Sequence, residues 1–296
     1  MKVSIAMQLN ITNYIKLTKP KILLLVILTG ITALVVEKSL LSDPLKFLLV
    51  VFALALTGGC ANALNQYFER EIDSQFERTR NKRPLPLKKI SPEQALIFAL
   101  ALGVLAVTIL VVFFNLFSAI LSLFTILYYS LFYTLWLKPR THQNIVIGGA
   151  AGAMGPVIAW AAASGTLELT PTILFLIIFF WTPPHFWALA LCLKEDYQKV
   201  KIPMLPVVKG DKETLRQILI YTLVLFGISL ALLLVKAGLL YLVAALILGL
   251  LYLWKAVVAW RRPSVKYARG LFGYSILYLF ILFVIIMIDV FWHKSL

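Results

Sequence analysis

Three oxygen-bearing side chains, Asn65, Glu69 and Asp73, follow one another at intervals of four residues at the end of a long apolar segment. In a helix, this spacing places all three on one curving flank. The outer two then lie about 12 Å apart along the axis, at about 1.5 Å rise per residue. One ion can hardly reach all three, but the side chains can flank a diphosphate, each helping to hold a separate Mg2+. None of them is the soft ligand that zinc or copper prefers.

A cationic cluster follows the acids in the same connection and includes Arg78 and Arg83 before Pro84. A diphosphate leaving group gains negative charge as its carbon–oxygen bond breaks, so cations held beside it stabilise the transition state more than the ground state. Arginine can also grip phosphate oxygens bidentately. The alternative is a solvated loop whose mixed charges only satisfy membrane topology. The regular spacing of the acids favours the metal–diphosphate site.

A second acidic position, Glu195 and Asp196, begins another polar connection that continues through Lys199. Two anionic clusters at one interface repel each other unless a cation lies between them. We therefore expect Asp196 to join the metal ligands and Lys199 to contact the diphosphate. The alternative is that Glu195 only pairs with Lys199 along a helix.

Two more cations, Lys138 and Arg140, precede a glycine-rich apolar segment. They can add to a phosphate cradle, or they can be ordinary positive-inside anchors. The spacing of the glycines, Gly148, Gly152 and Gly155 among them, is typical of close helix packing.

His185 lies inside an apolar segment, where an ionisable side chain is expensive. Its imidazole can ligate haem iron or bond to a neighbouring helix carbonyl. Pro183 and Pro184 predict a kink that opens room for a planar or long substrate. Trp181 and Trp187 can line that space, or they can belong to routine packing.

The chain that must position these residues is 61% hydrophobic and 14% charged over 296 residues. A soluble domain could not hide this much apolar surface, so we predict an all-α bundle of nine transmembrane helices forming one domain, residues 1–296. Its two long polar connections are residues 67–93 and 193–214. The predicted spans are about 22–36, 45–66, 94–114, 116–137, 144–163, 170–192, 215–235, 239–260 and 270–291.

Charge predicts the orientation of these spans. Of the 28 Lys and Arg residues, 24 fall on the side that holds the N-terminus and both long connections. By the positive-inside rule, the N-terminus is cytoplasmic and the C-terminus lies outside. The net charge of +15 thus reflects a membrane and not a nucleic-acid partner.

The motifs together resemble the UbiA-type superfamily of intramembrane prenyltransferases, whose first signature is an N-x-x-x-[DE]-x-x-x-D run followed by RT…RPLP. Three further stretches are similar to its haem O synthase branch: LKPRTHQNIVIGGAAGAMGP, WTPPHFWALAL and KEDYQKVKIPMLPVVKG. The resemblance covers nearly the whole chain. The chain departs from the superfamily's second signature, D-x-x-x-D, because Asp196 matches only the last acid and Cys192 replaces the first.

This resemblance implies an Mg2+-dependent enzyme of the bacterial plasma (inner) membrane, with farnesyl diphosphate as donor, haem B as acceptor and haem O as product. Association with haem-modifying or oxidase assembly proteins stays open. In the resulting mechanism, Mg2+ joins Asn65, Glu69, Asp73 and Asp196 to the diphosphate. A related enzyme acting on an aromatic quinone precursor is the main alternative. A transporter is disfavoured, because carriers place functional charge near the bilayer midplane.

Overall fold

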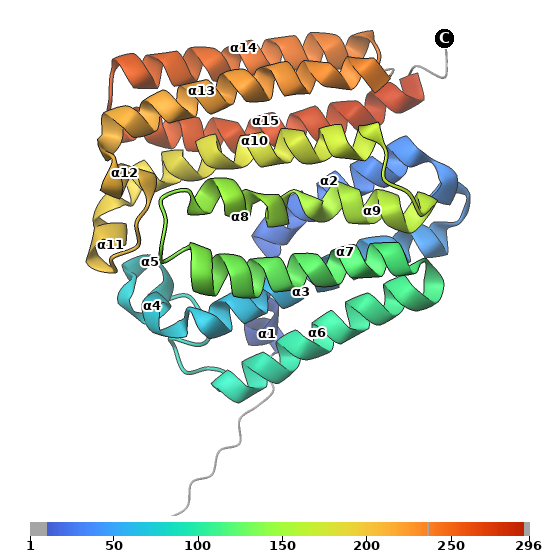
Figure 1. Cartoon of the computed structure of the whole chain (residues 1–296), viewed down its shortest axis with the longest axis horizontal. Helices are drawn as coiled ribbons and strands as arrows, with labels where there is room; N and C mark the ends of the chain where they lie inside the picture. Colours follow the sequence, from blue (N-terminus) through green and yellow to red (C-terminus); the bar gives the residue numbers. More distant parts are fainter. Residues whose placement is uncertain (1–10, 236, 293–296) are drawn as a thin grey trace, which may run out of the picture.

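The computed structural model describes residues 11–235 and 237–292, and all regular secondary structure within these ranges is helical (Figure 1). These ranges contain nine segments that are long and apolar enough to cross a membrane, which confirms the predicted helical bundle. The spans are α2 (Pro20–Glu37), α3 (Pro44–Phe68), α6 (Pro92–Phe113), α7 (Leu116–Leu127) with the π-helix Tyr128–Leu137, α8 (Asn144–Gly152) with α9 (Met154–Ser164), α10 (Leu169–Cys192), α13 (Gly210–Ala231) with the 3-10 turn Leu232–Val235, α14 (Leu239–Arg261) and α15 (Val265–Trp292).

The helices begin at recognisable capping signals. Proline occupies the first turn of α2, α3 and α6, where its missing N–H has no intrahelical partner to lose. Ser91 and Gln94 form a capping box at the start of α6, and Asn115 caps α7 by accepting from the Ser118 N–H at 2.9 Å. Helices α13 and α15 start about a turn before the predicted spans. The predicted spans start late because charged residues interrupt an apolar segment but do not interrupt a helix.

The α8–α9 segment forms the centre of the bundle. Buried residues make up 72% of its apolar window, against 28% for α6. Its glycines allow this close approach: a Cβ on Gly155 would lie 3.1 Å from the Val26 carbonyl oxygen of α2, and one on Gly148 would clash with the Tyr133 ring. Gly152 has open space instead. Close packing therefore accounts for two of these three glycines.

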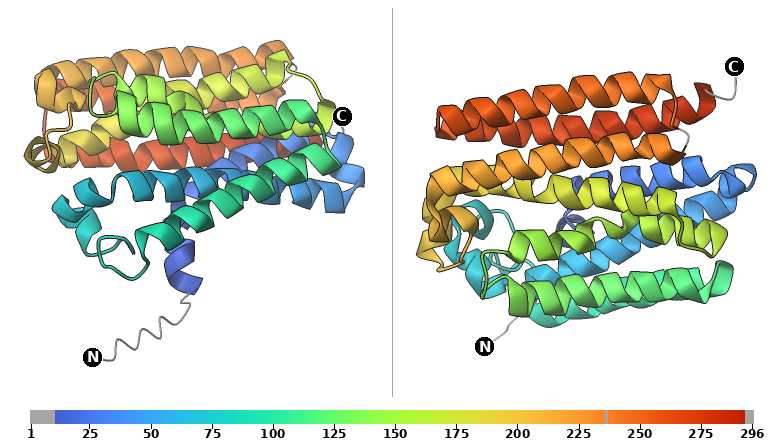
Figure 2. Two further views of the ribbon diagram at one scale, coloured as in Figure 1. Left: turned by 60° about the horizontal axis from the view of Figure 1, so that its bottom comes forward. Right: turned by 45° about the horizontal axis from the view of Figure 1, so that its top comes forward.

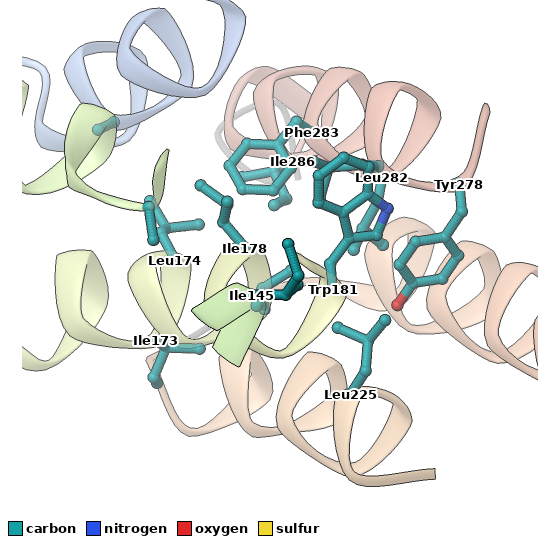
Figure 3. Close-up of a cluster of buried hydrophobic side chains, with 14 of the residues drawn as sticks. Ile145, Ile173, Leu174, Ile178, Trp181, Leu225, Tyr278, Leu282, Phe283 and Ile286 are labelled. Atoms are coloured by element: carbon teal, nitrogen blue, oxygen red, sulfur yellow. The ribbon is translucent and has the colours of Figure 1, made fainter. Parts of the chain in front are cut away.

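A continuous apolar core joins this centre to the later helices. Figure 3 shows Trp181 of α10 beside Tyr278 and Leu282 of α15, with Leu225 of α13 below them. Helix α10 continues through Pro183 and Pro184 as far as Cys192. This core holds α10 firmly, and α10 leads directly into the second polar connection.

Both long polar connections lie at the same end of the bundle, as predicted (Figures 1 and 2). The first contains the short helices α4 (Arg70–Gln75) and α5 (Glu77–Arg80), and the second contains α11 (Lys194–Lys199) and α12 (Leu205–Val208). We call this end of the bundle the loop end. The short helix α1 (Ile11–Leu17) precedes α2. The two chain termini, whose sides of the membrane the sequence predicts, lie outside the described residues.

Candidate active site

The three regularly spaced oxygen-bearing side chains lie on a helical path that continues past the end of α3. The Glu69 N–H donates to the Asn65 carbonyl at 2.9 Å, and the Asp73 N–H donates to the Glu69 carbonyl at 2.8 Å. Helical bonding therefore runs across the junction between α3 and α4. As predicted, the three side chains share one flank, and all are buried, with exposed fractions of 1%, 5% and 4% for Asn65, Glu69 and Asp73.

Each of these three side chains has its own cationic partner. Lys138 forms an ion pair with Glu69, and Arg83 forms one with Asp73. The ammonium of Lys19 donates to the Asn65 Oδ1 atom at 2.6 Å. The partners come from three different places: the turn before α2, the loop after α5 and the end of the fourth span. The site is thus a cluster of three cations around two carboxylates and one amide.

The fourth span reaches this cluster through a π-helix, Tyr128–Leu137. Its wider turn is visible in the bond from the Lys138 N–H to the Tyr133 carbonyl, five residues earlier, at 2.8 Å. Thr134 accepts from the Asn65 Nδ2 atom at 3.0 Å and donates to the Tyr129 carbonyl at 2.8 Å. The π-helix therefore fixes both the Asn65 amide and the start of the Lys138 side chain, and π-turns are frequent at functional sites.

Burial and charge act against each other on these groups. Burial would raise the pKa of Glu69, but the ammonium groups of Lys138 and Lys19 outweigh it and hold this pKa below its usual value. Burial likewise opposes the charge of Lys138, yet the Glu69 carboxylate raises the pKa of Lys138. This pair is therefore fully charged at neutral pH.

Two of the three remaining charged groups, Asp73 and Lys19, are less well compensated. Burial raises the pKa of Asp73, and Arg83 opposes this shift only in part. Burial, with help from the charge of Arg83, lowers the pKa of Lys19 to about 7. The cluster thus contains one carboxylate and one ammonium that would each gain from a further charge of opposite sign nearby.

The donor set fits Mg2+. Two carboxylates and an amide oxygen are the hard ligands that this ion takes, and the incomplete compensation of Asp73 is what a divalent cation would relieve. Within residues 11–235 and 237–292, no three His, Cys, Asp or Glu side chains gather closely enough to form a metal cluster by themselves. Such a site would therefore need a substrate phosphate to complete its ligands, which is usual for Mg2+.

The second polar connection lies beside the first, but its acids do not join the cluster of ion pairs. Tyr197 of α11 packs edge-on against Phe76, with ring centroids 5.4 Å apart. The neighbouring Asp196 is paired with Lys199 at 3.8 Å. Lys199 is exposed, and Glu195 is also exposed. The helical pairing thus involves Asp196 where the sequence suggested Glu195, and the metal role of Asp196 stays a prediction.

Of the five predicted diphosphate-binding cations, Arg83 and Lys138 lie in the cluster. Arg78 is exposed on α5. Arg140 is also exposed and donates to the carbonyl oxygens of Leu135 and Trp136 at 3.1 and 2.9 Å. It therefore satisfies the end of its own helix, which is the alternative interpretation of this residue.

The predicted acceptor residues lie on α10, within the membrane span. The His185 ring stacks between Trp181 and Phe272, at centroid distances of 4.3 and 4.7 Å. Its Nδ1 atom lies 2.7 Å from the Ser275 hydroxyl, which donates its own proton to the Phe272 carbonyl. The imidazole must therefore be the donor at Nδ1, which leaves a lone pair on Nε2.

Trp187 does not share this environment. It packs edge-on against Tyr221 of α13, with centroids 5.2 Å apart. Trp181 and His185 thus face α15, whereas Trp187 faces α13. Iron ligation by His185 stays a prediction, and the partner of its ring is a hydroxyl where the sequence suggested a helix carbonyl.

Comparisons with known proteins identify the family of this chain. Residues 23–290 match the model of the UbiA prenyltransferase family. The chain belongs to the UbiA prenyltransferase family. It is 46% identical over 282 residues to a protein from Picosynechococcus named protoheme IX farnesyltransferase, covering 94% of this chain and 89% of that protein. A protein of the same name from Parvibaculum lavamentivorans is 45% identical, with 94% and 88% covered.

Solved structures confirm the UbiA-type fold. A structure of a UbiA homologue from Archaeoglobus fulgidus, bound to DMAPP and Mg2+, superposes with a TM-score of 0.63. It is 14% identical and covers 93% of this chain and 99% of that one. At this identity the likeness concerns the fold alone. The family resemblance inferred from the sequence motifs is confirmed by the family model and the similar proteins, and the fold is confirmed by the solved structures.

Sequence reasoning missed two residues that contact Asn65 in this UbiA family chain, Lys19 and Thr134. Lys19 lies 46 residues before its partner Asn65 and looks like one more positive-inside lysine. Thr134 lies in an apolar segment, where a lone threonine usually bonds to its own helix. The one signal in the sequence for the position of Lys19 is the proline that follows it. Because proline often occupies the first turn of a helix, Lys19 is expected immediately before its span, at the membrane surface.

Proposed function

We propose that this chain transfers the farnesyl group of farnesyl diphosphate to a vinyl group of protohaem IX, with addition of water, to give haem O. The observation that supports the acceptor is the 46% identity, over 94% of the chain, to a protein named protoheme IX farnesyltransferase. The cluster of Lys19, Arg83 and Lys138 around two carboxylates supports the donor, because it suits a metal-bound diphosphate.

In this proposal, Asn65, Glu69 and Asp73 hold Mg2+, with Asp196 as a further ligand from the second polar connection. When bound, Mg2+ would supply positive charge that stabilises the leaving diphosphate. Arg83 and Lys138 are already at the site and contribute fixed positive charge to the same end. No side chain needs to bond to the farnesyl group, so the reaction proceeds without a covalent enzyme intermediate.

The chemistry then balances without an oxidant or reductant. The carbon–oxygen bond of the donor breaks, and the diphosphate leaves with the bonding electrons. The allylic farnesyl cation accepts electrons from the vinyl double bond of the haem. Water adds to the resulting carbon cation beside the porphyrin and loses a proton, which gives the hydroxyethylfarnesyl side chain. We further propose that the loop end faces the bacterial cytoplasm, as the 24 of 28 basic residues on that side indicate.

Purified protein in detergent tests the reaction directly. It is incubated with Mg2+, farnesyl diphosphate and either haem B or 4-hydroxybenzoate, and the products are analysed by mass spectrometry together with released pyrophosphate. We expect haem O and no prenylated benzoate. Prenylated benzoate without haem O would contradict the acceptor, and no pyrophosphate release with either acceptor would contradict the reaction itself.

The role of Asp73 is tested by Asp73→Ala, with Glu71→Ala as a matched control. Glu71 belongs to the same short helix, but its side chain is 84% exposed and forms only a long ion pair with Arg70. We expect Asp73→Ala to lose at least about a hundredfold in rate, the usual scale for one electrostatic group that stabilises a transition state. Glu71→Ala should keep its rate. Full activity in Asp73→Ala would contradict the metal role.

A further inference from the structure

The turn between α1 and α2 is held against α3 by two side-chain amides. The Asn62 Nδ2 atom donates to the Thr18 carbonyl at 3.0 Å. One turn further along α3, the Gln66 Nε2 atom donates to the carbonyls of Lys16 and Leu17 at 3.0 and 2.9 Å. Asn62 and Gln66 are buried. These bonds fix three consecutive carbonyl groups immediately before Lys19.

Lys19 itself has an unusual backbone. Its φ and ψ angles are 53° and 62°, in the left-handed region, which a residue with a Cβ rarely adopts. The following residue is Pro20, and a residue before proline normally takes an extended conformation. Residues in such conformations persist when their surroundings determine them and are concentrated at functional sites. Here the result is that the Lys19 ammonium points at Asn65.

The three cations of the site are not equivalent. Lys138 and Arg83 each neutralise a carboxylate, whereas Lys19 bonds to the neutral amide of Asn65. The positive charge of Lys19 therefore has no counter-ion of its own in the cluster. The bond from the Lys19 ammonium to a neutral amide oxygen also lacks the attraction between two opposite charges that the ion pairs of Lys138 and Arg83 have, so it is the easiest of the three to break. This ammonium is thus the one most available to an incoming anion.

We propose that Lys19 is a diphosphate-binding residue, whose ammonium moves from the Asn65 Oδ1 atom to a phosphate oxygen when the donor binds. This exchange also frees the Asn65 oxygen to serve as a metal ligand. Lys19 would therefore couple the binding of the diphosphate to the binding of the metal ion. The inference rests on the donor half of the proposed function and is independent of which acceptor is used.

Binding measurements without haem test this role. The probe is a non-ionising farnesyl thiodiphosphate at fixed Mg2+ concentration, measured by calorimetry on the full chain in detergent. We expect Lys19→Gln to weaken binding by about tenfold to a hundredfold, the scale of one hydrogen bond to a charged group. Lys19→Arg should restore most of the affinity. Lys21→Gln is the matched control, since Lys21 is exposed two residues further on, and should stay within about twofold.

A purely structural role predicts a different result. If Lys19 only holds Asn65, Lys19→Gln changes the Mg2+ concentration needed for binding but leaves the affinity for inorganic pyrophosphate without metal unchanged. That outcome would overturn the proposal. A structure of the wild-type chain with the thiodiphosphate covers the case in which Lys19→Gln does not fold. We expect the Lys19 ammonium within hydrogen-bond distance of a phosphate oxygen, and its retention on Asn65 would also overturn the proposal. Wild-type protein that binds the probe but makes no haem O would count against the acceptor only.

Discussion

The buried pair of Lys138 and Glu69 allows the energetics of the site to be tested apart from catalysis. We consider Lys138→Met, which keeps most of the apolar stem and removes the ammonium. The exposed fractions of the two side chains are 19% for Lys138 and 6% for Glu69, so the carboxylate would be left in a poorly hydrated place. Breaking a fully buried pair in this way costs about 3–5 kcal/mol. Because Lys138 is partly hydrated and Lys19 still lies near Glu69, we expect a smaller cost than this, about 2–4 kcal/mol.

The double variant Glu69→Met/Lys138→Met removes both charges. Replacing a buried ion pair by apolar side chains of similar volume is often close to neutral, so we expect this variant to recover most of the lost stability. Its donor binding should nevertheless be abolished, because the proposed metal ligand Glu69 and the proposed diphosphate-binding cation Lys138 are both missing. Stability and function thus change in opposite directions between the single and the double variant.

The assay is thermal unfolding in detergent without Mg2+ or substrate. At about 2 °C per kcal/mol for a chain of this size, Lys138→Met should lower the melting temperature by about 4–8 °C. The control is Lys46→Met, which removes the cation of an exposed pair with Asp43, where the side chains are 53% and 41% exposed. It should change stability by less than about 0.5 kcal/mol. Equal losses in the two single variants, or a double variant as unstable as Lys138→Met, would refute this reasoning.

Two further predictions concern packing and the choice of cations. A Cβ at position 155 would lie 3.1 Å from both the Thr29 Oγ1 atom and the Val26 carbonyl oxygen, whereas one at position 152 meets nothing within 4 Å. Gly155→Ala should therefore destabilise the protein by about 1–3 kcal/mol in a denaturation experiment, whereas Gly152→Ala should not. Equal stability of the two variants would contradict the close packing of α2 on α9. Arg83→Gln should weaken thiodiphosphate binding by at least about tenfold. Arg140→Gln should change this affinity by less than about twofold, because the Arg140 guanidinium donates to carbonyls of its own helix. A large loss of affinity in Arg140→Gln would instead indicate that Arg140 belongs to the site.

The fold was largely predictable because the bilayer restricts the possible structures. An apolar segment of about 20 residues in hydrocarbon must form a helix, so composition and length located the nine spans found in the described residues. The helix ends were less accurate at α13 and α15, where charged residues continue the helix beyond the apolar segment. The 4/4 spacing placed Asn65, Glu69 and Asp73 on one helical path for a similar reason, since helical periodicity is a local property of the sequence.

The partners of those ligands were only partly predictable. Arg83 lies ten residues from Asp73 in the same connection, so composition pointed to it. Lys19 and Lys138 lie 46 and 69 residues from their partners, and their contacts depend on a strained turn and on a π-helix. Neither feature has a recognisable pattern in a single sequence. Arg140 and Arg78 carry the same charge as Arg83, and nothing in their residue type shows that they face away from the cluster.

The one-to-one pairing of cations with oxygen ligands has a consequence for how the site can bind its donor. Carboxylates buried as deeply as Glu69 and Asp73 would be strongly destabilising if they stood unpaired before the metal arrived. Protein cations compensate them instead. Under the proposed function, Asn65, Glu69 and Asp73 would exchange these cations for Mg2+, and Lys19, Arg83 and Lys138 would then be free to contact the phosphate oxygens. The positive charge of Mg2+ would replace that of the cations beside the carboxylates, and the negative charge of the diphosphate would replace that of the carboxylates beside the cations. Neither free Mg2+ nor free diphosphate should therefore bind as strongly as the two together. Strong, metal-independent binding of diphosphate that is insensitive to Asp73→Ala would be incompatible with this linkage.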